Sequence, residues 1–176
     1  MASKIHQDMI NNRAGEGGGF AKEQLDKIDT VLDEYESSLG LPKFNDDFHD
    51  DTAKRYLQLS RDQIEKLTPE QCAEAALLLA SLSFHIQRSY NREIARVNWA
   101  DKTLKTTLAG REQAYKGSWE SQFNQAVKED GYAKKISDIK RYAQQRADRI
   151  NYLSSSIKNV SDVFINVQKS KVLKYG

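Results

Sequence analysis

The stretch that decides the fold is residues 68–118, TPEQCAEAALLLASLSFHIQRSYNREIARVNWADKTLKTTLAGREQAYKGS. It opens with Thr68, Pro69 and Gln71, which suit the N-cap, the first turn and the capping-box position of a helix. Apolar residues then recur every three or four positions with no further proline, as on one face of an amphipathic helix. We therefore expect a long helix over 69–117.

A second long helix is expected over 131–174, after a short helix and turn over 118–130. Its apolar residues fall on the a and d positions of an almost unbroken heptad. Arg146 is the one polar residue among them. We place Arg146 at the edge of the apolar face, where its long side chain reaches water, in preference to a role in setting the helix register.

The N-terminal third has a different character. Residues 1–19 end in Gly-Glu-Gly-Gly-Gly and are expected to form a flexible arm. Residues 20–68 form an acidic region of short helices, the first of which is ended by Gly40 and Pro42. The sequence thus predicts an all-α fold, an elongated antiparallel hairpin of two long helices with shorter N-terminal helices packed alongside, and a single helical domain over 20–176.

Composition excludes several classes of protein. The longest apolar run, residues 75–80, is far shorter than the roughly 20 residues that cross a bilayer. The first residues, MASKIHQDMINNR, lack the apolar stretch of a secretory signal. The single Cys72 lies on the apolar face of its helix and is interpreted as a buried structural thiol. We expect a cytoplasmic protein, in the host cytoplasm if a phage encodes it, with no membrane contact.

Charge is distributed unevenly along the chain. Residues 1–70 carry 9 Lys and Arg against 15 Asp and Glu, a net charge of −6, whereas residues 71–176 carry 18 against 10, a net of +8. The basic part suggests an anionic partner, and the acidic part could shield it or contact a protein partner. Ordinary solvation of charged faces is the alternative.

No catalytic or metal-binding pattern is present, so we expect neither an enzyme nor a cofactor. The run Lys116-Gly117-Ser118 reverses the Gly-Lys order of a phosphate loop. The acidic run 43–51 lacks both the glycine and distal glutamate of a calcium loop and the paired ligands of a zinc site. The histidines, including His85, have no partner at catalytic spacing.

The first long helix carries one pattern that suggests a binding site, a basic and aromatic stripe. At 100° per residue its members fall within an arc of about 120°; they are Arg88, Arg92, Arg96, Trp99, Lys102 and Thr103. If the apolar face of the helix is buried, the stripe faces outward, where Trp99 would stack on bases and the cations would contact phosphates. The alternative is that Trp99 packs on another subunit or on a second layer of helix in the same protein.

The segments SYNREIARVNWADKTLKTTL (89–108) and RADRINYLSSSIKNVSDVFINVQKSK (146–171) together resemble phage recombination mediators of the UvsY type over about residues 69–174. The resemblance lies in helix arrangement and residue style, and the acidic first third has no counterpart in it. It implies a homo-oligomer that binds single-stranded DNA and helps to load a recombinase. The residues that it implies for DNA binding are Arg88, Arg92, Arg96, Trp99, Lys102 and Lys105.

Two hypotheses follow. The first is an oligomeric accessory protein that binds single-stranded nucleic acid, such as a recombination or repair mediator. The second is a non-enzymatic structural or adaptor protein, of a virion or another assembly, in which the same stripe is a subunit interface. In both, the acidic N-terminal region is a candidate surface for a protein partner.

Overall fold

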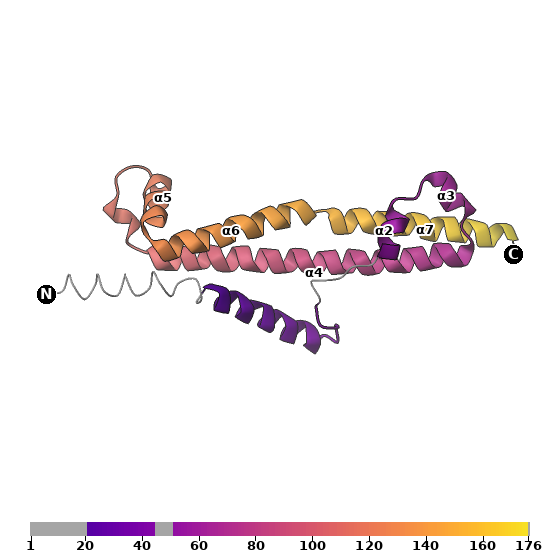
Figure 1. Ribbon diagram of the computed structural model, residues 1–176, viewed down its shortest axis with the longest axis horizontal. Coiled ribbons are helices and arrows are strands. Elements are labelled where there is room, and N and C mark those ends of the chain that lie inside the picture. Colours follow the sequence, from indigo (N-terminus) through magenta and orange to yellow (C-terminus); the bar gives the residue numbers. More distant parts are fainter. Residues whose placement is uncertain (1–20, 45–50, 176) are drawn as a thin grey trace. The chain divides into compact units, whose positions relative to one another are not determined.

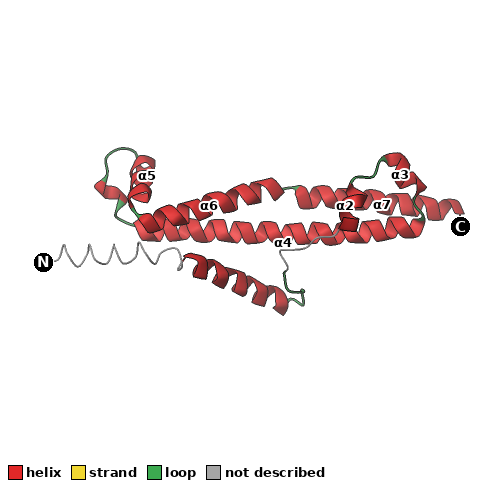
Figure 2. Cartoon of the chain, in the orientation of Figure 1, coloured by secondary structure: helices red, strands yellow, loops and turns green. Residues whose placement is uncertain are grey.

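The computed structural model describes residues 21–44 and 51–175, and all regular secondary structure in these ranges is helical (Figures 1 and 2). An N-terminal helix covers residues 21–38. The later elements are α2 (Asp51–Leu57), α3 (Arg61–Lys66), α4 (Pro69–Leu108), the 3₁₀ turn η1 (Glu112–Ala114), α5 (Trp119–Glu129), α6 (Gly131–Ile150) and α7 (Leu153–Tyr175). The prediction of an all-α fold is confirmed.

The capping signals place helix starts correctly. Gln71 N–H donates to Thr68 Oγ1 over 3.2 Å, and Thr68 N–H donates to Gln71 Oε1 over 2.9 Å, so the expected capping box opens α4. The same reciprocal pair links Ser60 and Gln63 at the start of α3. Each box satisfies two backbone donors that a helix start would leave without partners.

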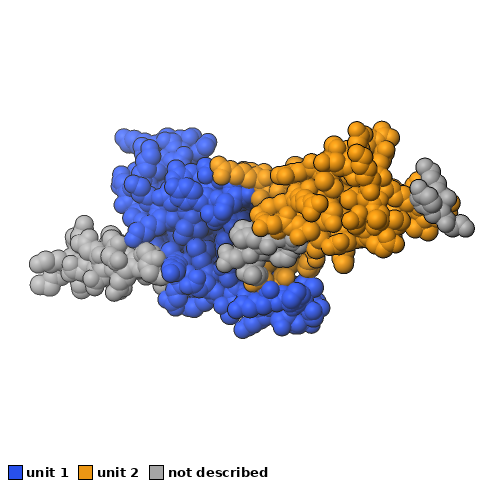
Figure 3. All heavy atoms as spheres, turned by 45° about the vertical axis from the view of Figure 1, so that its right-hand side comes forward, with its two compact units in different colours: residues 1–43, 92–147 blue, residues 44–91, 148–176 orange. Residues whose placement is uncertain are grey.

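The chain divides into two compact units (Figure 3). Unit 1 comprises residues 1–43 and 92–147, and unit 2 comprises residues 44–91 and 148–176. Because the continuous helix α4 contributes to both units, the expectation of one domain over 20–176 stays a prediction.

Within unit 1, the C-terminal part of α4 pairs with α6 in antiparallel fashion. Lys140 Nζ donates to Asp101 Oδ1 and Arg146 Nη2 to Glu93 Oε2, so residue numbers fall on one helix as they rise on the other. The core contains mainly small and branched apolar side chains, namely Ala21, Ala100, Leu104, Leu108, Ala126, Ala133 and Ile136. Arg146 is half exposed beside Glu93, which confirms its predicted place at the edge of the apolar face.

Within unit 2, the N-terminal part of α4 pairs with α7, also antiparallel. Ser161 Oγ donates to the Ala76 carbonyl over 2.8 Å, and Ser83 Oγ donates to the Ser154 carbonyl over 2.9 Å. The core here consists of Cys72, Ala75, Ala76, Leu79, Ile157 and Phe164. The predicted burial of Cys72 is confirmed, and antiparallel helix pairing is confirmed in each unit.

Two predicted helix boundaries are wrong. The first long helix ends at Leu108 and not at residue 117, because Gly110 adopts a φ of +80° and turns the chain into η1. The second long helix is interrupted at Tyr152, whose φ of +65° is incompatible with helix continuation. The Tyr152 carbonyl instead accepts the Ser156 N–H and so begins α7. The apolar heptad runs through this break, which is why periodicity does not reveal it.

Candidate functional site

The predicted stripe lies on α4, but its members have different surroundings. Arg88 and Arg92 are buried, with 7% and 5% of their surface exposed. Arg96 and Trp99 are partly buried, and Lys102 and Lys105 are exposed. Arg88 belongs to unit 2 and the other five residues to unit 1. The stripe is therefore not a uniform exposed surface in this structure.

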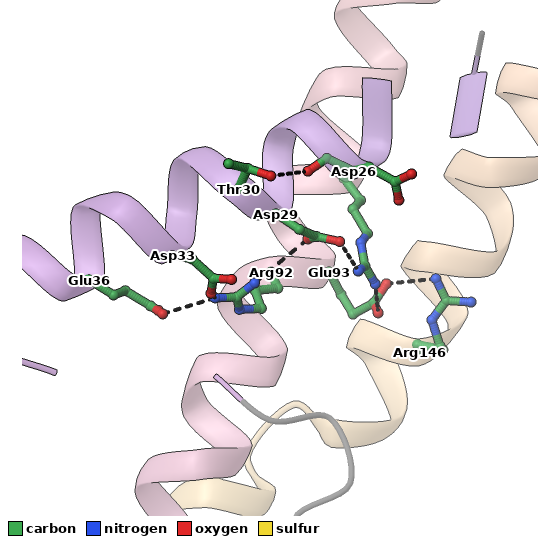
Figure 4. A network of polar contacts seen from close by, with 9 residues as sticks. Asp26, Asp29, Thr30, Asp33, Glu36, Arg92, Glu93 and Arg146 are labelled. Carbon is green, nitrogen blue, oxygen red and sulfur yellow. Dashed lines mark hydrogen bonds and ion pairs between the residues drawn. The ribbon is translucent and has the colours of Figure 1, made fainter. Parts of the chain in front are cut away.

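The N-terminal helix covers the arginines of the stripe in unit 1 (Figure 4). Its residues Asp29, Asp33 and Glu36 are spaced four and then three apart, so they lie on one face of the helix. Arg92 Nη2 donates to Asp33 Oδ1 and, over 3.0 Å, to Glu36 Oε2. Arg92 Nη1 also lies 3.8 Å from Asp29 Oδ1. Three carboxylates thus surround one buried guanidinium.

Arg96 extends this network to the rest of unit 1. Its Nη2 donates to Asp29 Oδ2 over 2.8 Å and its Nη1 to Glu93 Oε1 over 2.7 Å. Glu93 in turn accepts from Arg146 Nη2 of α6 over 2.9 Å. The N-terminal helix, α4 and α6 are therefore joined by one chain of charged hydrogen bonds (Figure 4).

The arginines remain charged throughout the accessible pH range. Burial alone would lower the pKa of Arg92, but the hydrogen bonds to Asp33 and Glu36 outweigh it and raise that pKa. Burial alone would also lower the pKa of Arg96, but the bonds to Asp29 and Glu93 outweigh it and raise that pKa. The guanidinium groups of Arg92 and Arg96 are thus permanent cations within the network.

Trp99 packs against the core cluster of unit 1, which includes Ala21 of the N-terminal helix and Ala100 of α4. This contact matches the alternative interpretation of the stripe, in which a second layer of helix in the same protein covers the tryptophan. Lys102 is exposed and has no ion pair within the described ranges. Lys105 pairs with Asp101 over 2.7 Å.

In unit 2, Arg88 lies over two aromatic rings. Its guanidinium carbon is 5.2 Å from the ring centre of Phe44 and 5.8 Å from that of Phe84. Phe44 also stacks on His85 with 4.8 Å between ring centres and an interplanar angle of 5°. Arg88 is therefore engaged in packing within its own unit.

An exposed basic face lies on α6 of unit 1. At 100° per residue, Lys134, Lys135, Arg141 and Tyr142 occupy an arc of about 120° together with Asp138. The Arg141 guanidinium lies 5.0 Å from the ring centre of Tyr142, which is 51% exposed, and also pairs with Asp138 over 2.9 Å. The sequence shows these cations, but the exposed tyrosine among them is not apparent from periodicity alone.

The described residues offer little for other chemistry. Within them, no group of three or more His, Cys, Asp and Glu side chains is arranged to hold a metal ion. No helix in the described ranges has the length and apolar character needed to cross a membrane. Residues 45–50 of the acidic run and the N-terminal arm lie outside the described residues. Comparisons with protein-family models, curated proteins and solved structures find no match.

Proposed function

We propose that this chain is a non-enzymatic accessory protein that binds single-stranded nucleic acid through unit 1. The observation that carries the proposal is the exposed face of α6, which Lys134, Lys135 and Arg141 share with the exposed ring of Tyr142. Cations that neutralise phosphates and an aromatic ring on which a base stacks are the two elements of sequence-independent strand binding. Lys102 on α4 adds a further exposed cation.

The resemblance to recombination mediators is compatible with this proposal and makes it more specific. It adds a homo-oligomeric state and a recombinase as protein partner. Both remain proposals about this chain, as does the preference for DNA over RNA.

The test is titration of a fluorescently labelled single-stranded oligonucleotide with the protein, followed by anisotropy at several salt concentrations. The logarithm of the association constant should fall linearly with the logarithm of salt concentration, by about 0.7 for each phosphate neutralised. Changing Lys134 and Lys135 to Gln should reduce that slope by about 1.4. The exposed Lys158 of α7 is the control, because its change to Gln should leave the slope unaltered.

Tyr142→Ala tests the stacking contribution. Loss of one stacked base should weaken binding by about 1–3 kcal/mol. Tyr35 is the matched control, because it is similarly exposed, at 63%, and lies on the acidic N-terminal helix. If no binding is seen at low salt, or if the Tyr35 and Tyr142 variants bind equally well, the proposal is wrong.

A second candidate is an adaptor or structural protein, and a different observation favours it. Val31 and Tyr35 lie one turn apart on the N-terminal helix with 62% and 63% of their surface exposed. Large apolar side chains on one exposed face suit contact with a second protein surface. In that case the change of both residues to Ser should reduce the mass of the assembly in light scattering and leave oligonucleotide binding unchanged.

A further inference from the structure

The arginine network of unit 1 contains two guanidinium groups on α4 that are not part of the exposed basic face of α6. Arg92 and Arg96 are one turn apart on α4 and are met by Asp29, Asp33 and Glu36 of the N-terminal helix. Guanidinium groups bind carboxylate and phosphate oxygens with the same planar donor geometry. A phosphate can therefore compete with these carboxylates for the two guanidinium groups.

These ion pairs are the polar attachment of the N-terminal helix. Its one residue in the buried core is Ala21, which has a small side chain. Leu25, Ile28 and Leu32 are only partly buried, although they form its apolar face. A segment with few fully buried side chains opens at a lower free energy than the core of its domain. A polyanion that competes for the same arginines can thus displace it.

Displacement of the N-terminal helix would uncover a net positive charge on α4 and α6. With the helix in place, four carboxylates face three guanidinium groups in the network, since Glu93 joins the three acids and Arg146 joins the two stripe arginines. Without the three acids, the three arginines face Glu93 alone, a local net charge of +2. Trp99 and Lys102 follow on the same stripe of α4.

We propose that the N-terminal helix is an intramolecular mimic of a polyanion, which covers a second strand-binding surface formed by Arg92, Arg96, Trp99 and Lys102. A bound single strand displaces the helix and takes over its arginines. This inference rests on the proposed function, because it requires that unit 1 binds nucleic acid at all. The inference accounts for the opposite net charges of the two parts of the chain, because the acidic part shields the basic one.

The experiment compares two triple variants of the full-length chain with the wild type. In the first, Asp29→Asn, Asp33→Asn and Glu36→Gln remove the carboxylates that face the arginines. In the second, Glu23→Gln, Asp26→Asn and Glu34→Gln remove three exposed carboxylates of the same helix. Both triple variants change the net charge by the same amount, so they separate loss of the cover from a general gain in charge.

The first variant should bind a single-stranded oligonucleotide roughly tenfold more tightly than the wild type, about the worth of one charge-assisted hydrogen bond. Its salt slope should be steeper by about 1.4, for two additional phosphates. The second variant should differ little from the wild type. Equal tightening in both variants, or no tightening in the first, overturns the inference and leaves the proposed function intact. Absence of binding by all three proteins at low salt overturns both.

Hydrogen exchange on the wild type gives a second measurement that does not depend on how the variants fold. Amides of residues 21–38 should exchange faster when the oligonucleotide is bound, because the helix has left α4. Amides of the unit 1 core, such as that of Ile136, should keep their protection. Unchanged exchange in residues 21–38 on binding contradicts displacement even if the oligonucleotide binds.

Discussion

Replacing Arg92 by Met removes the most buried cation of the network and leaves its carboxylates facing one another. The Arg92 side chain is 6% exposed, and its partners Asp29, Asp33 and Glu36 are 30%, 28% and 15% exposed. Removing one partner of a buried ion pair lowers the free energy of unfolding by about 3–5 kcal/mol. Because the carboxylates keep part of their hydration, we expect a loss at the lower end of this range, about 3 kcal/mol. Glu36→Gln should cost only about 1 kcal/mol, since Arg92 retains Asp33.

A double-mutant cycle isolates the contribution of the pair. We expect a coupling free energy of about 1–2 kcal/mol between Arg92 and Glu36, obtained from urea unfolding of the wild type, both single variants and the double variant. Tryptophan emission reports on unit 1, which contains both Trp99 and Trp119. The exposed pair Glu23 and Lys27 on the same helix is the control.

That control pair is about 60% exposed on each side, so its coupling should be about 0.3–0.5 kcal/mol. In 1 M salt, where the Debye length is about 3 Å, the control coupling should vanish and that of Arg92 with Glu36 should largely persist. A coupling for Arg92 and Glu36 no larger than the control would refute the conclusion that these ion pairs help to hold the N-terminal helix on α4.

Three further predictions concern the rest of the chain. Phe164→Ala should lower the free energy of unfolding, measured by circular dichroism in urea, by about 3–5 kcal/mol, because the ring is fully buried in unit 2. Hydrogen bonds from Lys105 and Lys140 lower the pKa of Asp101. The ionised Asp101 side chain therefore stabilises the fold at neutral pH, and this contribution is lost as the pH falls below about 4. The difference in unfolding free energy between the wild type and Asp101→Asn should shrink below that pH. Burial raises the pKa of the Cys72 thiol against the opposing effect of Lys171, so a thiol reagent should react slowly with the native protein and rapidly in denaturant.

Periodicity and capping residues were sufficient to predict the class of fold. The apolar face of α4 and the Thr68 cap depend only on neighbours within a few positions, and both are confirmed. Backbone dihedrals at single residues cannot be predicted in this way. Gly110 and Tyr152 adopt positive φ, and only the glycine, which lacks a Cβ atom, is a residue type that signals this conformation. A tyrosine in that region is held by its surroundings, which periodicity does not describe.

The stripe on α4 was predicted as a set of residues but not with its cover. The spacing of Asp29, Asp33 and Glu36 matches that of Arg92 and Arg96, yet most helices carry acids at such spacing on faces that remain in water. Which helix packs against which face depends on the connection between them, and the sequence contains no signal for it. The charge split at residue 70 was the one indication in the sequence that the acidic and basic parts neutralise each other.

Neutralisation within the chain also determines how salt dependence should be interpreted. Each phosphate that replaces a carboxylate at Arg92 or Arg96 forms one ion pair and breaks another, so the exchange itself releases few counterions. The wild type should therefore show the salt slope of its exposed cations alone. Removing the facing carboxylates turns exchange into net association, and the slope then rises by the contribution of the two arginines. A salt series thus distinguishes displacement of the helix from simple attachment of a strand to the outer face of α6, because only displacement makes the slope depend on Asp29, Asp33 and Glu36.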